Sequence, residues 1–442
     1  MPLRKLGTKM LGNRVRRCPV SGRGVVVALC AVALLASACS GGGGATRASD
    51  ASTLAIGTVY PLAGAQGFQG TQERRGVQLA AEWANDHHVL GSRRIELVSE
   101  PADRAEAVPG VMADLQRRGI DLVVGSHASA ISQAAAAVAT QQHQLFWETG
   151  AVGQTLPGTG GGRSFFRVAP MGSNLGSSAI EFVAQQVAPH LRAGHPLRYA
   201  VAYVDDPYGR EVADGAIAEI RSLHEPYAGA FAYDAATVDY HELARKIAAV
   251  RPDVLYVSAY IPDGIALRRA LVDEHVPLLA NIGTSSSYCM LQFGQPLGAE
   301  AVGLFASDKP DADDVNPTAL APEGRAALAW VSKVYRTRYH EDMPAPALSG
   351  FSAAYALFVH VLPAAHGDSP DAVAEAALSV HLPKGTLANG SGMSFAPPGR
   401  ADAGDNRAAT SVIWEWVAPG KRVVVWPAAF ATHRLEVLPL AR

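Results

Sequence analysis

The feature that most constrains the fold is a regular alternation of short apolar runs with longer helical stretches. The runs are apolar throughout and end in turn residues, which is typical of strands buried on both faces of a parallel sheet. They are LAIGTVYP, RIELVSEP, DLVVGSH, QLFWETG, RYAVAYVDD, VLYVSAY and PLLANIG. The helical stripes between them include Val77, Ala80, Ala81 and Ala84, and then Leu243, Ile247 and Val250. Strands and helices in steady alternation predict an α/β fold of doubly wound parallel sheets.

The first 38 residues have the features of an export signal. They hold seven Lys or Arg and no acid, and they end in an apolar run at 25–38. This run is shorter than the roughly 20 residues that a membrane-spanning helix needs. Small residues before Cys39 resemble a lipobox, which predicts that Cys39 is acylated; simple secretion with an unmodified Cys39 is the alternative. Residues 39–52 are then expected to form a flexible tether.

Charge and cysteine content narrow the class of protein. Without the signal, 31 Lys and Arg face 40 Asp and Glu, a net charge of −9, which argues against a nucleic-acid partner. Cys18 and Cys30 leave with the signal, and a lipid on Cys39 leaves Cys289 alone, so no disulfide framework is expected. The roughly 390 residues that remain are enough for two or three domains.

The junction DLVVGSHAS, at residues 121–129, is the first candidate for a binding site. A buried strand ends at Gly125, and Ser129 is placed to be the N-cap of the alanine-rich helix that follows. Ligands of open α/β sheets bind beyond the carboxyl ends of the strands, where helix N-termini converge. Free N–H groups and the helix dipole favour an anionic or carbonyl group there by roughly 0.3 to 1 kcal/mol. The loop is therefore suited to a carboxylate.

Catalytic and cofactor motifs are missing from the sequence. Neither the hydrolase pattern G-x-S-x-G nor the phosphate loop G-x-x-x-x-G-K-[ST] occurs. The run GTGGGR follows no strand and opens no helix, so it is interpreted as a surface loop. The fourteen histidines are scattered, and the adjacent pair His87 and His88 would point apart on a helix, which makes a metal site improbable. No cofactor, no metal and no catalytic activity are expected.

Several separated motifs occur in a characteristic order over residues 54–427. They are IGTVYPLAG, GIDLVVGSHAS, FFRVAP, VDDPYGREV, RPDVLYVSAY and MSFAPPGRADAGDNRAATSVIWEW. Together they resemble the type I solute-binding proteins of ABC importers, the group that contains the leucine/isoleucine/valine-binding proteins. The resemblance implies a monomer with two α/β lobes that close over a small solute and deliver it to a permease and its ATPase.

The resemblance also implies how the chain divides. The first lobe would comprise residues 53–170 and 308–392, and the second lobe residues 171–307 and 393–435. The chain would cross between them three times, near residues 170–173, 307–309 and 392–394. A solute that contacts both lobes only when they are closed would shift the hinge toward the closed state.

The residues of the first binding wall follow from the resemblance position by position. Ser129, with its neighbours Ser126 and His127, matches the loop that receives the solute carboxylate. Gly150 and Val152 match the second part of that wall. Val152 stands where the amino-acid binders have a threonine that donates to the carboxylate.

The opposite wall departs further from the amino-acid binders. Tyr208 and Tyr260 match pocket tyrosines, although each has a structural alternative as a turn residue or strand cap. Gln69 falls where the family often has an aromatic residue over the solute side chain. Thr284 stands at the position of the carboxylate that neutralises the solute ammonium, and burying an unpaired ammonium costs several kcal/mol. Glu148 is a candidate for the missing charge; a solvent-exposed acid or a salt bridge with an arginine are its alternatives.

Three functions remain open from the sequence. The favoured one is a binding subunit for an importer, with an amino-acid-like, amide or related acid solute and an extracytoplasmic, lipid-anchored location. The second is a sensor that presents a solute to a signalling partner, although the sequence contains no signalling segment. The third is an exported enzyme of unrecognised type, for which no catalytic constellation is found.

Overall fold

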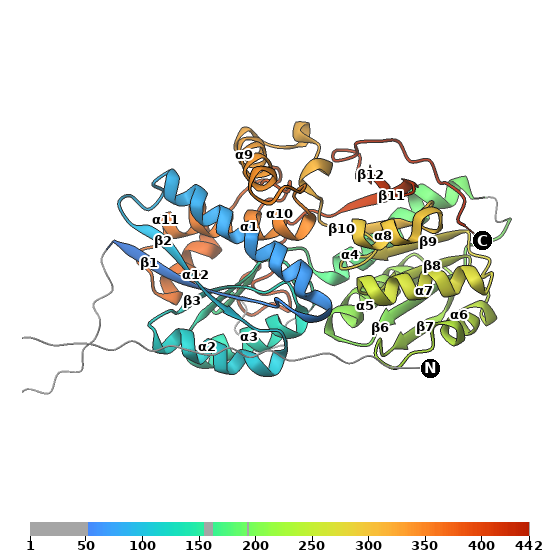
Figure 1. The fold of residues 1–442 in the computed structure, drawn as a ribbon, viewed down its shortest axis with the longest axis horizontal. Coiled ribbons are helices and arrows are strands. Elements are labelled where there is room, and N and C mark those ends of the chain that lie inside the picture. Colours follow the sequence, from blue (N-terminus) through green and yellow to red (C-terminus); the bar gives the residue numbers. More distant parts are fainter. Residues whose placement is uncertain (1–51, 154–161, 192–193, 442) are drawn as a thin grey trace, which may run out of the picture. The chain divides into compact units, whose positions relative to one another are not determined.

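The fold is that of a computed structural model, which describes residues 52–153, 162–191 and 194–441. The predicted export signal and acylated Cys39 lie outside these residues. Over the described residues the strands form a five-stranded sheet and a seven-stranded sheet, each with helices packed against it (Figure 1). This arrangement confirms the predicted α/β class.

The first sheet is wholly parallel, with the strand order β2-β1-β3-β4-β5. Its strands are β1 (Thr53–Tyr60), β2 (Arg94–Pro101), β3 (Leu122–Gly125), β4 (Leu145–Glu148) and β5 (Phe165–Arg167). The first four lie where the apolar runs predict them. Strand β5 was not predicted, because three residues are too few to show a period. All five carboxyl ends point to the same edge of the sheet.

The second sheet has the order β12-β11-β10-β9-β8-β6-β7 and is parallel except at one end, where β11 pairs antiparallel with both β10 and β12. Its strands are β6 (Tyr199–Val204), β7 (Tyr227–Tyr233), β8 (Val254–Ser258), β9 (Ala280–Thr284), β10 (Phe305–Asp308), β11 (Val412–Ala418) and β12 (Lys421–Trp426). Three of them, β6, β8 and β9, coincide with predicted runs. The antiparallel hairpin of β11 and β12 is an addition to the predicted parallel arrangement.

Helices cover both faces of the sheets. The longer ones are α1 (Gly67–Asp86), α2 (Val108–Arg117), α3 (Ser129–Gln142), α4 (Gly172–Phe182), α5 (Pro207–Ser222), α6 (Tyr240–Ala249), α7 (Ile261–Asp273), α8 (Leu291–Leu297), α9 (Pro322–Tyr339), α10 (Ala345–Tyr355) and α12 (Pro370–Ser379). Around the first sheet, α2 and α3 pack on one face, and α1 packs with α10 on the other (Figure 1).

The alternation of side chains along β3 and β4 explains why these runs are apolar throughout. Val123 and Phe146 enter the core cluster beneath α2 and α3, whereas Val124 and Trp147 enter the cluster beneath α1 and α10. Neighbouring residues of a strand point to opposite faces. Because helices cover both faces, every position along these strands is buried, and the sequence shows a continuous apolar run rather than an alternating one.

Two glycines allow α1 and α10 to pack closely. A Cβ on Gly76 would lie 1.9 Å from the carbonyl oxygen of Ala347, and a Cβ on Gly350 would lie 2.1 Å from the carbonyl oxygen of Glu73. Any larger residue at either position would separate the two backbones. The close packing leaves Glu73 of α1 completely buried against α10.

Within the described ranges, one helical stretch, Ala345–Ala364, is long and apolar enough to cross a membrane by length and composition alone. Most of it is buried inside the protein. Its side chains, among them Leu348, Phe351 and Phe358, belong to the core cluster of the first sheet. The stretch is therefore accounted for as a core helix.

The later part of the chain contributes to both sheets. Helices α9, α10 and α12 pack into the core of the first sheet, and Met393 and Phe395 belong to the same cluster. Strands β11 and β12 then join the second sheet. The chain thus returns to the first sheet after β10 and leaves it again before β11.

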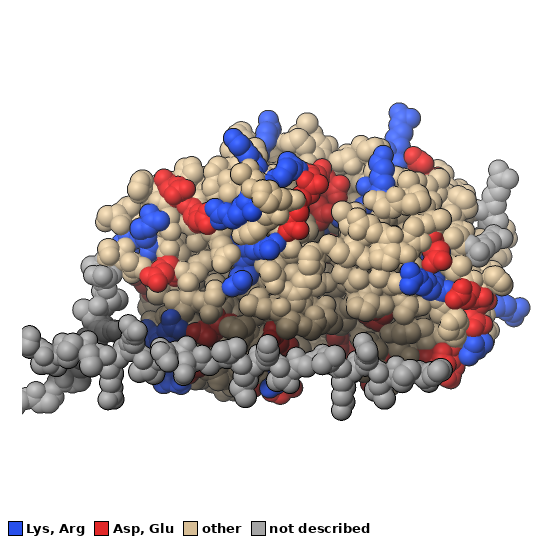
Figure 2. Space-filling model, in the orientation of Figure 1, with Lys and Arg blue, Asp and Glu red and all other residues tan. Residues whose placement is uncertain are grey.

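Acidic and basic side chains are interspersed on the face of the protein shown in Figure 2. Exposed ion pairs join Arg336 to Asp313 and Asp342, and Arg338 to Glu82. Exposed pairs of this kind typically contribute only about 0 to 1 kcal/mol each. The stability of the fold therefore rests on its buried clusters rather than on this mixture of surface charges.

Candidate functional site

The sequence-predicted binding residues lie at the carboxyl ends of strands in both sheets. In the first sheet, Gly125 pairs with Glu148 and Glu148 pairs with Arg167, so the loops after β3, β4 and β5 leave from one edge. In the second sheet, Tyr208 follows β6 and Tyr260 follows β8. This is the edge at which ligands of open α/β sheets bind.

Glu148 organises the first wall rather than projecting from it. Its Oε1 accepts hydrogen bonds from the backbone N–H groups of Gly150 (2.7 Å) and Ala151 (2.6 Å). Its Oε2 accepts from the N–H of Ser126 (3.2 Å) and from the hydroxyl of Ser132. The side chain is fully buried, so it is neither a solvent-exposed acid nor, among the described residues, the partner of an arginine. Burial, with the charge of Glu73 beside it, raises the pKa of Glu148.

Ser129 lies in the first wall, but its local role differs from the prediction. Helix α3 begins at Ser129 and its N-cap residue is Ala128, so the prediction that Ser129 is the N-cap is wrong. The Ser129 hydroxyl oxygen instead accepts a hydrogen bond from the N–H of Gly153 at 2.9 Å. A Cβ on Gly153 would lie 2.6 Å from the Cβ of Ser129 and 3.1 Å from the carbonyl oxygen of Pro207. The loop after β4 thus packs between Ser129 and the start of α5.

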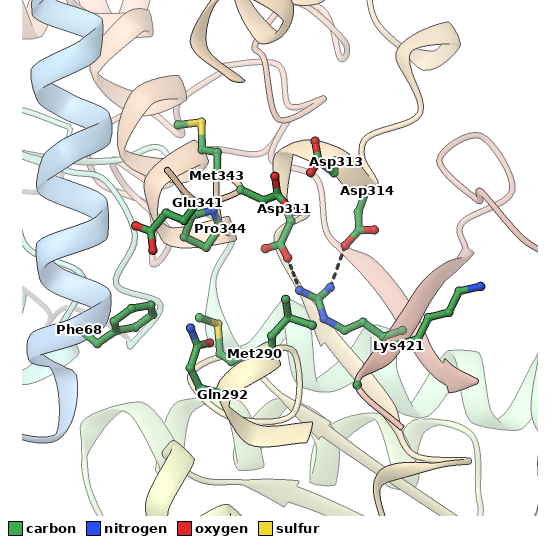
Figure 3. Close-up of a pocket in the computed structure, with 14 residues that line it drawn as sticks. Phe68, Met290, Gln292, Asp311, Asp313, Asp314, Glu341, Met343, Pro344 and Lys421 are labelled. Atoms are coloured by element: carbon green, nitrogen blue, oxygen red, sulfur yellow. Dashed lines mark hydrogen bonds and ion pairs between the residues drawn. The ribbon is translucent and has the colours of Figure 1, made fainter. Parts of the chain in front are cut away.

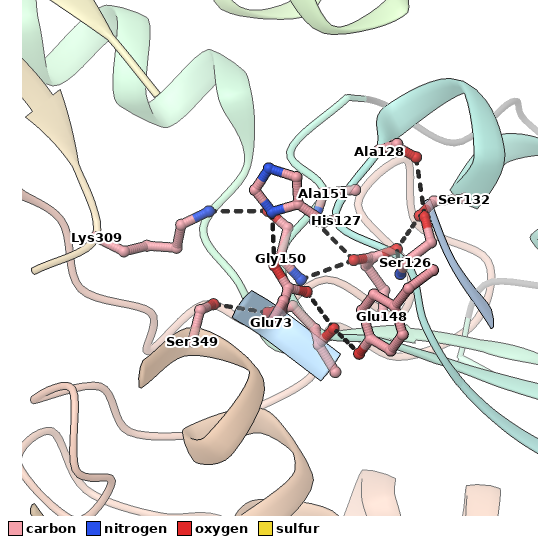
Figure 4. A network of polar contacts seen from close by, with 12 residues as sticks. Glu73, Ser126, His127, Ala128, Ser132, Glu148, Gly150, Ala151, Lys309 and Ser349 are labelled. Carbon is pink, nitrogen blue, oxygen red and sulfur yellow. Dashed lines mark hydrogen bonds and ion pairs between the residues drawn. The ribbon is translucent and has the colours of Figure 1, made fainter. Parts of the chain in front are cut away.

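A second buried carboxylate, Glu73, lies behind the same wall (Figure 4). It accepts from His127 Nδ1 at 2.6 Å and from the hydroxyl of Thr149. The Thr149 oxygen lies 2.7 Å from the hydroxyl of Tyr60. Because Thr149 uses its only proton on Glu73, Tyr60 donates to Thr149. Sequence reasoning missed Glu73, although an acid four residues before Val77, on the apolar stripe of a helix, is a signal that could have found it.

Gln69 is placed one helical turn before Glu73 on α1. Its side chain is only 1% exposed, and neither atom of its amide has a hydrogen-bond partner among the described residues. His127, 6% exposed, is in a similar position, because its Nε2 also has no partner there. These two predicted residues therefore bring unpaired polar atoms to a buried region.

The two predicted tyrosines lie together in the opposite wall, with ring centroids 5.3 Å apart. Tyr208 donates to the carbonyl oxygen of Ser285, and Tyr260 donates to the carboxylate of Asp206. Burial raises the pKa of both hydroxyls well above the usual value, so both remain protonated donors. Asp206 also accepts from the N–H of Gly209 (2.7 Å) and so caps α5, which fixes the first turn of the helix that carries Tyr208.

Thr284 is turned into its own sheet. Its hydroxyl donates to the carbonyl oxygen of Ser307 at 2.7 Å, and the residue is fully buried. It therefore has neither the charge nor the orientation to neutralise an ammonium group. Val152 is also buried, and it packs in the core cluster of the second sheet with Leu175.

Lys309 links the two sheets and was not predicted as a site residue. It follows β10 of the second sheet, is 2% exposed, and donates from Nζ to the carbonyl oxygen of Gly150 at 2.9 Å (Figure 4). Its second neighbour is Asp308, whose Oδ1 lies 3.6 Å from the same Nζ. A lysine directly after a buried strand was the available sequence signal, because buried lysines are rare unless paired.

Arg167, at the end of β5, holds the loop after β4 from the other side. It is fully buried and donates from Nη2 to the carbonyl oxygen of Gly153. Its Nη1 lies 3.4 Å from Asp405 Oδ1, and the residues 167 and 405 also form a backbone bridge. Two long-range contacts, from Arg167 and Lys309, therefore fix the loop that Ser129 and Glu148 hold locally.

A pocket of about 330 Å³ lies away from these residues (Figure 3). Its lining includes Phe68 of α1, Leu291 of α8, and Arg422 of β12 with its partners Asp311 and Asp314. None of the sequence-predicted binding residues lines it. Hydrogen-bonding groups and tyrosines converge at the loops described above, so we place the candidate site there and not in this pocket.

The pocket does supply a pH-dependent contribution to stability. Burial raises the pKa of Asp311 to about 6, although the ion pair with Arg422 acts in the opposite direction. A carboxyl group whose pKa is higher in the folded than in the unfolded protein contributes stability below the unfolded pKa, about 3.9, and loses it as pH rises through the folded pKa. From pH 4 to pH 6.5, we expect Asp311 to lower the free energy of unfolding by up to about 3 kcal/mol.

Urea unfolding at several pH values checks this expectation. The Asp311→Asn variant removes the titrating group, so its stability should fall less than that of the unchanged protein over the same pH range. Identical pH profiles for the two proteins would contradict the assignment.

Comparison with known proteins connects this geometry to a family. The sequence model of the family described as periplasmic binding protein matches residues 53–412. Among curated relatives, the Leu/Ile/Val-binding protein homolog 8 of Brucella abortus is 25% identical over 391 residues, which cover 86% of this chain and 93% of that protein.

Solved structures share the fold at lower identity. A leucine binding protein, LivK, from Thermotoga maritima superposes with a TM-score of 0.70 at 17% identity, covering 84% of this chain and 98% of that one. The substrate binding protein LivJ of a branched-chain amino acid transporter from Streptococcus pneumoniae, in complex with isoleucine, gives a TM-score of 0.67 at 18% identity, covering 85% and 100%.

Proposed function

The chain belongs to the periplasmic binding protein family, and from this premise we propose that it is the solute-binding subunit of an ABC importer. The family and the curated relatives are binding proteins, which act outside the cytoplasm. The proposed task is to capture a small polar organic solute and to present it to a permease and its ATPase. The solute class we propose is amino-acid-like, an amide or a related acid, in keeping with relatives named for leucine, isoleucine and valine.

The observation that carries this proposal is the meeting of two sets of loops at strand carboxyl ends. The first set, held by Glu148, contains Ser126, His127, Ser129 and Gly150. The loop containing Gly153 reaches from Ser129 to Pro207, directly before Tyr208. A solute between these loops would touch elements of both sheets.

We further propose that the two sheets belong to two lobes that close over the solute. The crossings lie near residues 170–173 and near 307–309, where Lys309 donates to Gly150. The third crossing, predicted near residues 392–394, we now propose slightly later in the chain, because Met393 and Phe395 pack in the first core. It would lie between Phe395 and Val412, which starts β11. A solute with contacts to both lobes binds the closed state better and shifts the population toward it.

The proposed membrane attachment is through a lipid on Cys39, which lies outside the described residues. The stretch at 39–52 would serve as the tether, and the protein would act as a monomer beside the permease. Mass spectrometry of the N-terminal peptide tests this directly. An unmodified Cys39 in the membrane fraction would contradict it.

The proposed function is tested by identifying what the purified full chain carries. Mass spectrometry of solutes released by denaturation should find a small organic molecule, and adding that molecule back should raise the melting temperature. The stabilisation should increase with concentration above the dissociation constant, as mass action requires. Release of no solute, together with no stabilisation by amino acids, amides or organic acids, would contradict solute capture.

Ser129→Ala is expected to weaken binding of that solute by about 1 to 3 kcal/mol, the usual cost of leaving a buried partner unpaired. The reason is that the N–H of Gly153 loses its acceptor and the loop after β4 loses its attachment to α3. Isothermal titration calorimetry measures the change. Ser177→Ala is the matched control, because the Ser177 hydroxyl only donates within α4, to Asn174. If the two variants bound the solute with equal affinity, Ser129 would not belong to the binding site.

A further inference from the structure

The side-chain amide of Gln69 is buried, and neither of its polar atoms has a hydrogen-bond partner among the described residues. It sits in the first turn of α1 at 1% exposure. Buried polar atoms in folded proteins nearly always have a hydrogen-bond partner, and an unpaired amide is costly. A side chain whose NH₂ group and carbonyl oxygen are both uncompensated is therefore a candidate for ligand contact.

His127 brings a second unpaired atom to the same region. Gln69 and Glu73 are four residues apart on α1 and so lie on the same helix face. The His127 ring places Nδ1 on Glu73, at 2.6 Å, and its Nε2 points away from that carboxylate (Figure 4). Glu73 accepts from Nδ1, so in the tautomer that this bond requires the single ring proton is on Nδ1 and Nε2 is an acceptor. The uncompensated groups are thus the Gln69 NH₂ group as donor, and the Gln69 carbonyl oxygen and His127 Nε2 as acceptors.

Charge in this region disfavours a carboxylate. The wall contains the buried carboxylates of Glu73 and Glu148, and the positive Lys309 is matched by Asp308 at 3.6 Å. The charge of Arg74 acts on Tyr60 beside them, so two carboxylates face one cation without an ion pair among the described residues. Burial raises the pKa of Glu148, and the charge of the neighbouring Glu73 raises it further. A third carboxylate, from a solute, would be repelled in a medium of low dielectric constant.

The carboxylates of this region also offer few free oxygens to bind an ammonium group. Both oxygens of Glu148 already accept two hydrogen bonds each, and the oxygens of Glu73 are occupied by His127 and Thr149. Thr284, at the expected position of a counter-charge, is neutral and donates to Ser307. An ammonium group therefore meets two carboxylates that already accept hydrogen bonds, and it finds no charge at position 284.

We propose that the site selects a solute with a neutral planar donor–acceptor group, a carboxamide or a urea, which Gln69 and His127 Nε2 bind. The amide of Gln69 forms a reciprocal pair of hydrogen bonds with the carbonyl and one N–H of that group. His127 Nε2 accepts from a second N–H. The inference rests on the proposed function, since it specifies the solute that the binding subunit captures.

Calorimetry on the full chain at pH 7 tests the selectivity with matched probes: acetamide, propionamide and benzamide against acetate, propionate and benzoate, with urea added. The amides should bind at least about tenfold more tightly than the corresponding acids, which is the effect of one buried hydrogen-bond pair. Gln69→Leu should reduce the amide affinity at least about tenfold and leave the acid affinity unchanged. Gln185→Leu, at an exposed glutamine paired only with Glu181, is the matched control.

A stability measurement separates a ligand-binding role from a structural one. Replacing an unpaired buried amide with an apolar side chain removes a cost, so Gln69→Leu should raise the melting temperature of the solute-free protein, by about 2 °C or more. If Gln69 instead stabilised the fold, its replacement would lower the melting temperature. Gln69→Met, of similar length, serves as the second variant if the leucine variant does not fold.

The outcomes distinguish this inference from the function on which it rests. A released solute that contains a carboxylate but no carboxamide or urea group would overturn the inference and leave solute capture intact. Acids that bind more tightly than amides, or a Gln69→Leu variant with unchanged affinity for the released solute, would also overturn it. If no solute is released and no probe binds, solute capture itself fails. A released carboxamide or urea whose binding Gln69→Leu weakens supports the inference even if the small probes bind poorly.

Discussion

Glu148→Leu is expected to destabilise the protein by about 3 to 5 kcal/mol, the cost of breaking a buried charged network. The carboxylate accepts from three backbone N–H groups and one hydroxyl, and it joins the loop after β3 to the loop after β4. An apolar side chain leaves all of these donors buried without partners. Solute binding should disappear in the same variant, because both loops of the first wall lose their shape.

Glu148→Gln distinguishes the hydrogen bonds from the charge. Its amide oxygen can keep the bonds from Gly150 and Ala151, while its NH₂ group faces the N–H of Ser126. We therefore expect a smaller loss of stability, about 1 to 3 kcal/mol, and a measurable loss of solute affinity. Urea unfolding and calorimetry give the two quantities, and Glu375→Leu, at an exposed site on α12, is the control. Full stability of Glu148→Leu would contradict the role assigned to this carboxylate.

Arg167→Met is expected to have the second largest effect, also about 3 to 5 kcal/mol, because it leaves Asp405 buried without its counter-charge. Arg167 is fully buried. Burial raises the pKa of Asp405, and the charge of Arg167 acts in the opposite direction. The variant also removes the donor to the Gly153 carbonyl oxygen, so the loop that meets Ser129 loses one attachment. Urea unfolding measures the change in free energy.

A double-mutant cycle shows whether the pair acts as a unit. Replacing both partners with apolar residues, Arg167→Met with Asp405→Leu, should cost clearly less than the sum of the single changes, because no charge is left buried alone. Arg210→Met is the control: Arg210 forms an exposed pair with Asp205, so its replacement should leave the stability nearly unchanged. If the effects of Arg167→Met and Asp405→Leu on the free energy of unfolding were additive, the two residues would have no coupling energy.

The local features of the fold were predictable from sequence. Strands such as β3 and β4 are apolar at every position because helices cover both faces, and this pattern is visible without a structure. Two kinds of element were not predicted because they lack this continuous apolar pattern. Strand β5 has only three residues, and the hairpin of β11 and β12 lies at the end of a sheet. The placement of Ser126, His127 and Ser129 at a strand carboxyl end also followed from local pattern.

The partners of the site residues were not predictable. The sequence permits Glu148 to be a counter-charge, an exposed acid or part of a salt bridge, whereas in the fold it accepts from the backbone of two loops. Gln69 is a polar residue near the start of a helix, and only the packing of the chain around it makes its amide buried and unpaired. Lys309 and Gly150 are far apart in sequence and meet only because the chain returns between the sheets.

The sequence by itself determined the α/β class, most of the parallel strands and the edge at which binding residues gather, because these depend on local periodicity and on the direction of parallel strands. Only the tertiary structure decided which polar groups are satisfied and which remain unpaired. The physical reason is that the free energy of a buried polar atom depends on whether it has a hydrogen-bond partner. That partner often comes from a distant part of the chain, which only the fold brings close.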